Sequence, residues 1–69
     1  MQYMVNLGNR IKLRRKELKI TQATLAELSG ISLNTLSRIE VGKANPTIEM
    51  LSKIADILGL ELKLEVKNA

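Results

Sequence analysis

Cysteine and histidine are both absent from this chain of 69 residues. Without cysteine there is neither a disulfide framework nor a thiolate zinc site. Without histidine the chain lacks the commonest general base and the commonest metal ligand. We therefore expect a protein that is not an enzyme and that holds no metal and no cofactor.

Aromatic residues and long apolar runs are also scarce. The chain has no phenylalanine or tryptophan and one tyrosine, Tyr3, whereas proteins that bind single-stranded nucleic acids stack the bases on aromatic side chains. This composition does not favour RNA binding.

No apolar run is long enough to span a membrane, and the amino-terminal MQYMVNLGNR lacks the charged and apolar regions of a secretory signal. These features predict a cytoplasmic protein.

Positive charge is concentrated in one part of the chain. Residues 1–43 hold eight Lys and Arg against three Glu, whereas residues 44–69 hold three Lys against four Asp and Glu. The first part therefore has a net charge of +5 and the second part has −1, which together give the net charge of +4. A basic half suits a polyanionic partner such as nucleic acid, although a solvated basic face is the alternative. A single domain of this size is marginally stable, so association with another chain would help it.

Apolar spacing and capping residues predict four short helices. The first covers about residues 6–18, and the second follows the N-cap Thr21 and ends at Gly30. The third follows the N-cap Ser32 and stops at Gly42, while the fourth follows Thr47 and ends at Gly59. Serine and threonine are favoured caps because their oxygens accept hydrogen bonds from the first free N–H groups of a helix.

The tight turn at Gly30 between the second and third helices is typical of a helix-turn-helix. Leu36 and Ile39 would seat the third helix on the domain, which leaves serine, asparagine and threonine on its other side. A solvated face is usually rich in Glu and Lys, which are stronger helix formers than these residues. The face therefore favours contact with DNA, and an ordinary helical hairpin is the alternative.

The period of the pattern changes in the tail, LELKLEVKN. Four apolar residues alternate there with charged ones, which predicts a strand: Leu60, Leu62, Leu64 and Val66. A lone strand needs a partner for its backbone groups, and MQYMV is a short and weakly patterned candidate. We expect the same strand of a second copy instead. Antiparallel pairing with its axis at Leu64 brings opposite charges together, in the pairs Glu61–Lys67 and Lys63–Glu65.

Residues 7–59 resemble the helix-turn-helix domain of the phage Cro/C1 repressors and the bacterial Xre-type regulators. The matching residues are Thr21-Gln22, Leu25-Ala26, Gly30, Ser37-Arg38-Ile39-Glu40, Gly42-Lys43 and Asn45-Pro46-Thr47. The resemblance implies an all-α, lambda-repressor-like bundle of roughly four to five helices with a C-terminal dimerisation strand. It divides the chain into a DNA-binding domain, residues 1–59, and a dimerisation element, residues 60–69. It also implies a sequence-specific regulator that binds an inverted repeat in double-stranded DNA as a homodimer.

The resemblance further implies roles for individual residues. Four match the positions that contact bases: Leu33, Asn34, Ser37 and Arg38. Four match positions that contact the DNA backbone, with capping as the alternative for Ser32: Gln22, Ser32, Thr35 and Lys43. The position of Gln22 is also implied to brace the reading helix. At Leu33 the family often has a polar residue, so this leucine either touches a thymine methyl group or simply packs. Arg15 and Glu40 match a shielded ion pair that fixes the angle of the reading helix.

The tail LGLELKLEVKNA also resembles the end of HipB-type antitoxins, which dimerise through such a strand. This implies an autorepressor that also binds a toxin, a HipA-like kinase. Leu13 and Leu28 lie outside the apolar stripes and are candidates for an apolar patch that meets this partner, although single exposed leucines are common. The alternatives are a controller protein of a restriction system and a phage-type repressor without a toxin.

Overall fold

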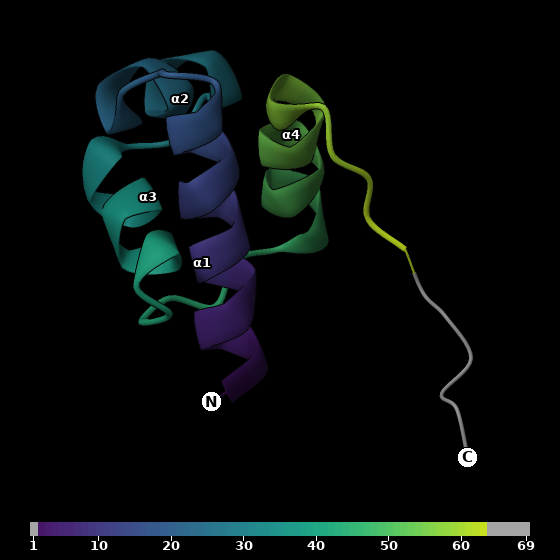
Figure 1. The fold of residues 1–69 in the computed structure, drawn as a ribbon. Coiled ribbons are helices and arrows are strands. Elements are labelled where there is room, and N and C mark those ends of the chain that lie inside the picture. Colours follow the sequence, from purple (N-terminus) through teal and green to yellow (C-terminus); the bar gives the residue numbers. More distant parts are fainter. Residues whose placement is uncertain (1, 64–69) are drawn as a thin grey trace.

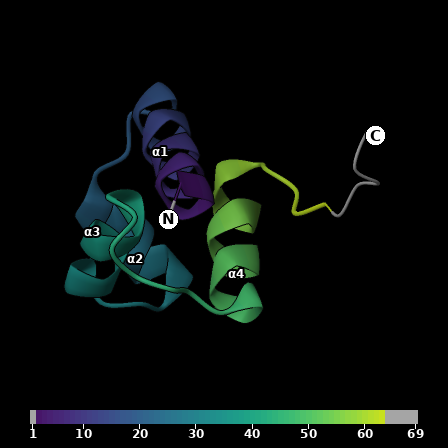
Figure 2. The ribbon, with the colours of Figure 1, turned by 90° about the horizontal axis from the view of Figure 1, so that it is seen from below.

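The computed structural model describes residues 2–63, which form four helices and no strand. The helices are α1 (Gln2–Glu17), α2 (Gln22–Ser29), α3 (Leu33–Glu40) and α4 (Ile48–Leu58). α1 and α2 each pack against both α3 and α4. In the view of Figure 1, α3 lies to the left of α1 and α4 to its right, and Figure 2 shows the same four helices from below. The predicted all-α helix-turn-helix fold is confirmed. In the part of the chain described, no helix combines the length and the apolar content that a membrane crossing requires.

Side-chain caps and glycines define the limits of the shorter helices. Thr21, Ser32 and Thr47 each accept a hydrogen bond from the backbone N–H three residues later, at 3.0, 3.0 and 3.1 Å. A cap of this kind stabilises a helix by about 1 kcal/mol. α2 and α4 are followed by Gly30 and Gly59, whose φ angles are 71° and 69°. Glycine suits this left-handed conformation because it has no Cβ, and these boundaries agree with the sequence predictions.

α1 begins earlier than predicted, at Gln2 rather than near residue 6. MQYMV is therefore helical from Gln2 and does not provide a strand for the tail. An added Cβ at Gly42 would lie 2.8 Å from Val5 Cγ2, so the early turns of α1 lie directly on the loop that follows α3. This contact joins distant parts of the chain, which explains why local spacing underestimated the helix.

α1 also ends without the glycine that terminates α2 and α4. Lys19 has a φ of 59°, and its N–H donates to Lys16 O at 3.0 Å while Ile20 N–H donates to Arg15 O at 3.2 Å. This is the hydrogen-bond pattern that normally places glycine at the left-handed position. A lysine there costs conformational energy, because its Cβ crowds the backbone. Leu18, at the predicted end of this helix, lies just beyond it and is exposed.

The hydrophobic core draws on all four helices. Its buried members are Ile11, Leu25, Ala26, Leu36, Ile39, Ile54 and Leu58. Complete burial of a leucine or isoleucine side chain stabilises a fold by about 1.5–3 kcal/mol. Leu36 and Ile39 are the residues through which α3 is seated, as the sequence predicted, and this contact sets the position of the helix-turn-helix on the rest of the domain.

The tail does not form the predicted strand within the described residues. Residues 60–63 have no regular secondary structure, and Leu60 N–H donates to Ala55 O at 2.8 Å as part of the C-terminal cap of α4. Leu60 packs against the core of its own chain. Its part in dimerisation stays a prediction, because the pairing was expected with a second copy of the chain. Leu62 is exposed. Leu64 and Val66, together with the predicted pairing axis, lie outside the described residues.

Candidate nucleic-acid interface

α2 and α3 are joined by a short, well-bonded turn. Gly30 N–H donates to Glu27 O at 3.2 Å, and Ile31 N–H donates to Ala26 O at 3.0 Å. The Ile31 side chain packs against the core and Ser32 caps α3 immediately afterwards. The two helices therefore keep a fixed relative orientation, which is what a helix-turn-helix needs in order to place its second helix in a groove.

The side of α3 that faces away from the core carries the residues predicted to contact bases. Leu33, Asn34 and Arg38 are exposed, whereas Thr35 and Ser37 are half-buried. The opposite side is closed by Leu36, Ile39 and Glu40, which are all buried. The structure thus brings three of the four predicted base-contacting residues together on an accessible surface. Ser37 lies at the edge of this surface, because its side chain turns toward α2.

The first turn of α3 is held by two hydroxyl groups. Ser32 Oγ accepts a hydrogen bond from Thr35 N–H at 3.0 Å and donates to Thr35 Oγ1 at 2.8 Å. The capping role considered for Ser32 is therefore present in the structure. Since Thr35 Oγ1 accepts the Ser32 proton, the Thr35 hydroxyl keeps its own proton for an acceptor outside this pair.

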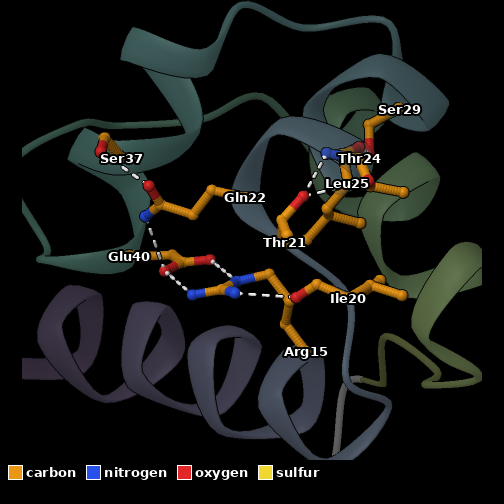
Figure 3. Close-up of polar contacts among 9 residues, drawn as sticks. All are labelled: Arg15, Ile20, Thr21, Gln22, Thr24, Leu25, Ser29, Ser37 and Glu40. Atoms are coloured by element: carbon orange, nitrogen blue, oxygen red, sulfur yellow. Dashed lines mark hydrogen bonds and ion pairs between the residues drawn. The ribbon is translucent and has the colours of Figure 1, made fainter.

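Arg15 and Glu40 form the ion pair expected from the sequence (Figure 3). Arg15 Nε donates to Glu40 Oε2 at 2.8 Å and Arg15 Nη2 donates to Glu40 Oε1 at 3.1 Å. The remaining guanidinium nitrogen, Nη1, donates to Ile20 O at 2.9 Å. The two side chains are only 9% and 1% exposed. This bidentate contact joins α1 to the last residue of α3, and it leaves neither charge without a partner.

Gln22 extends this pair into a network that reaches α2, as Figure 3 shows. Its Nε2 donates to Glu40 Oε1 at 3.0 Å, and its Oε1 accepts a hydrogen bond from Ser37 Oγ at 3.3 Å. The resemblance implied that Gln22 braces the reading helix, and these two bonds join it to α3. The sequence did not reveal which residues of α3 it meets. The available signal was the spacing of Ser37 and Glu40, which lie three residues apart on one side of α3.

Arg38 is bonded to the loop after α3. Its Nη2 donates to Lys43 O at 3.1 Å, and Lys43 N–H donates to Arg38 O at 2.8 Å. The exposed Lys43 side chain follows directly from this turn. The loop therefore restrains the guanidinium group of Arg38, and among residues 2–63 its other N–H donors have no hydrogen-bond partner.

Gly8 also positions α3, although no sequence-based prediction covered it. A Cβ added to Gly8 would meet Ile39 O, and it would lie 2.8 Å from Glu40 O. Only glycine allows the backbone of α1 to approach the end of α3 so closely. The signal in the sequence was a glycine inside a helical pattern, which often marks such a close approach.

Comparison with known proteins agrees with this geometry. The helix-turn-helix family model HTH_3 matches residues 11–64. The immunity repressor protein of Bacillus phage phi105 is 40% identical over 58 residues, which cover 84% of this chain and 40% of that repressor. The phage CTXphi repressor RstR of Vibrio cholerae is 38% identical over 58 residues, covering 84% of this chain and 52% of RstR. The chain thus spans about half the length of these curated relatives.

A solved structure resembles the whole domain. The restriction-modification controller protein C.AhdI from Aeromonas hydrophila superposes with a TM-score of 0.84 at 30% identity, and the match covers 88% of this chain and 92% of that protein. The match of the family model to most of the chain, together with this likeness, shows that the chain belongs to the helix-turn-helix family of Cro/C1-type DNA-binding transcriptional regulators.

Proposed function

We propose that this chain is a sequence-specific repressor that reads double-stranded DNA with α3. The observation that carries the proposal is the surface formed by Leu33, Asn34 and Arg38, which are exposed on a helix whose other side is buried. The bidentate Arg15–Glu40 pair supports it by fixing the end of this helix to α1. A recognition helix needs this combination, because base edges are reached only by side chains on a rigidly seated helix in the major groove.

Each side chain on this surface suits a different base edge. The free donors of Arg38 can fork onto guanine O6 and N7, and the Asn34 amide can pair with adenine N6 and N7. Leu33 can make apolar contact. A base contact by Ser37 would require its hydroxyl proton to leave Gln22, to which it donates in this structure.

The predicted backbone contacts surround the same helix. Gln22 uses one amide N–H on Glu40, so its second N–H is available for a phosphate oxygen. The Thr35 hydroxyl proton and the Lys43 ammonium group are two further donors beside α3. Ser32 caps the N-terminus of α3, which is the end of the helix that would approach the DNA. Contacts of this kind position a protein on DNA without reading its sequence.

Dimerisation is the second part of the proposal, with residues 1–59 as the DNA-binding domain and residues 60–69 as the dimerisation element. A groove of about 380 Å³ is lined by α1, α4 and the tail, and its apolar lining includes Leu7, Ile11, Leu51 and Leu62. No residue of α3 lines this groove among the described residues, and α4 and α3 lie on different sides of α1 in the view of Figure 1. A second copy bound there would bury apolar surface and leave both reading helices free for half-sites about one DNA turn apart.

Autoregulation as a HipB-type antitoxin is a further proposal, with a HipA-like kinase as the partner. Leu13 and Leu28 are 55% and 60% exposed, on α1 and α2, so both are accessible to another protein. Co-purification of a kinase would support this role, and Leu28→Glu should then abolish neutralisation of the toxin while DNA binding is kept.

Two other kinds of regulator are alternatives to the antitoxin. One is a controller protein of a restriction system, which the likeness to C.AhdI favours, and the other is a phage-type repressor without a toxin.

Selection from a pool of randomised DNA duplexes tests the central proposal. We expect the protein to enrich an inverted repeat, and footprinting on the DNA upstream of its own gene should find the same sequence. Binding should weaken steeply with salt, because each phosphate that is neutralised releases condensed counterions. If no sequence is enriched at low ionic strength, the proposal is wrong.

A further inference from the structure

Leu33 is an exposed apolar side chain on an otherwise polar surface. It is 50% exposed and lies between Ser32 and Asn34, which are both exposed. Leu33 is not a core residue: Leu36 and Ile39, whose exposed fractions are 0% and 2%, pack α3 against the domain. Leu33 is not part of the N-cap either, since Ser32 and Thr35 form that cap. Neither the core nor the cap accounts for a leucine at this position.

The first residues of a recognition helix are the ones that face base edges. In the major groove every base pair presents hydrogen-bonding groups, and the only apolar group displayed is the C5-methyl group of thymine. Leucine can neither donate nor accept a hydrogen bond. We propose that Leu33 recognises a thymine methyl group in each half-site, an inference that rests on the proposed function.

This contact would also select against other bases. Against a G·C pair, Leu33 would remove water from hydrogen-bonding groups without replacing those bonds, which is costly. Asn34 and Arg38 lie on the same accessible side of α3 and can pair with purines. The half-site should therefore contain a thymine beside the bases that these two residues read.

Deoxyuridine provides a direct probe, because it lacks only the methyl group and keeps the pairing edge of thymine. The full chain is first used to select a preferred duplex, and each thymine of that duplex is then replaced singly by deoxyuridine. We expect affinity to fall about fourfold at one thymine of each half-site, which is the value of one buried methyl group. Failure to select any duplex would overturn the proposed function itself. A selected duplex with no sensitive thymine would overturn only this inference.

A variant identifies the side chain responsible. Leu33→Ala should bind thymine and deoxyuridine equally at the sensitive position, and it should fold, because Leu33 is exposed and alanine is a good helix former. Ile48→Ala is the matched control. Ile48 is the first residue of α4 and follows the N-cap Thr47, as Leu33 follows the N-cap Ser32, and it is 73% exposed. Its sensitivity should equal that of the unaltered protein. The inference is wrong if Leu33→Ala keeps the fourfold preference for thymine.

Discussion

Arg38 and Lys43 hold each other at the end of α3 through two hydrogen bonds. Lys43 N–H donates to Arg38 O at 2.8 Å, and Arg38 Nη2 donates back to Lys43 O at 3.1 Å. The loop after the helix thus restrains the arginine side chain before any DNA is bound. Such a restraint lowers the entropy that the arginine loses on contact with a base.

Arg38→Ala should therefore reduce specificity more than general affinity for DNA. We expect it to cost about 1–3 kcal/mol of binding free energy on the selected duplex and much less on random duplexes. Fluorescence anisotropy at a fixed salt concentration measures both. Lys53→Ala removes one positive charge from an exposed position on α4 and should leave the ratio between the two duplexes unchanged. Equal losses on both duplexes for Arg38→Ala would show that Arg38 reads no base.

Arg15→Met should destabilise the fold strongly, because it leaves the carboxylate of Glu40 buried without its cation. The expected loss is about 3–5 kcal/mol of unfolding free energy, measured by urea denaturation followed by circular dichroism. Lys16→Met, at the exposed neighbouring position, should change it by less than about 0.5 kcal/mol. The double variant Arg15→Met/Glu40→Leu should recover much of the loss. A small effect of Arg15→Met alone would contradict the structural role of this pair.

Gly8→Ala should also be destabilising, although alanine favours a helix by about 1 kcal/mol over glycine. The new Cβ would meet Ile39 O and push the end of α3 away from α1. Overpacking of this kind typically costs about 1–3 kcal/mol. Asn9→Ala, at the exposed next position of α1, gains the helix preference without the clash and should be neutral or stabilising in the same denaturation experiment. A gain in stability from Gly8→Ala would contradict the close approach of the two helices.

Lys19→Gly should stabilise the protein. Lys19 has a φ of 59°, which costs a residue with a side chain about 1–2 kcal/mol, whereas glycine loses about 0.5–1 kcal/mol in extra entropy on folding. The net gain should be about 0.5–1 kcal/mol, visible as a higher midpoint of thermal unfolding. Lys16→Gly, inside α1, should lower the midpoint, and a lower midpoint for both variants would refute the prediction.

Leu62→Glu should weaken the proposed dimer, because it places a charge in the apolar groove between α1 and α4. Sedimentation equilibrium should show a larger fraction of monomer, and affinity for a duplex with two half-sites should fall toward that for one half-site. Leu18→Glu adds the same charge at an exposed position that does not line this groove. If both variants self-associate as the unaltered protein does, the dimer forms elsewhere or not at all.

The caps and turns, which depend on neighbouring residues, lie where the sequence predicts them. Thr21, Ser32 and Thr47 cap the helices that they were predicted to cap, because an N-cap bond joins residues only three apart. Gly30 adopts the left-handed conformation required between α2 and α3. The tail depends on more than neighbouring residues, because a strand needs a hydrogen-bonded partner. That partner was expected on a second copy, so the strand stays a prediction, and residues 60–63 have no regular secondary structure in the single chain.

The assignments of Leu33, Asn34, Ser37 and Arg38 to base contacts remain predictions. The resemblance selected their positions, and the structure shows that Leu33, Asn34 and Arg38 are accessible while Ser37 is bonded to Gln22. No spacing rule revealed that Gln22, on α2, would link Ser37 to the buried Glu40. That contact joins residues on different helices, so it exists only once the helices have packed.

By itself, the sequence determined that this is a small helical protein with a glycine turn before a polar-faced helix, because caps, turns and helical periods are local properties of the chain. The tertiary structure alone decided how far α1 extends, why Gly8 must be small, and how the Arg15–Glu40–Gln22 network fixes α3. These features depend on distances between segments that are remote in sequence. Such distances are set when apolar side chains from all four helices share one core.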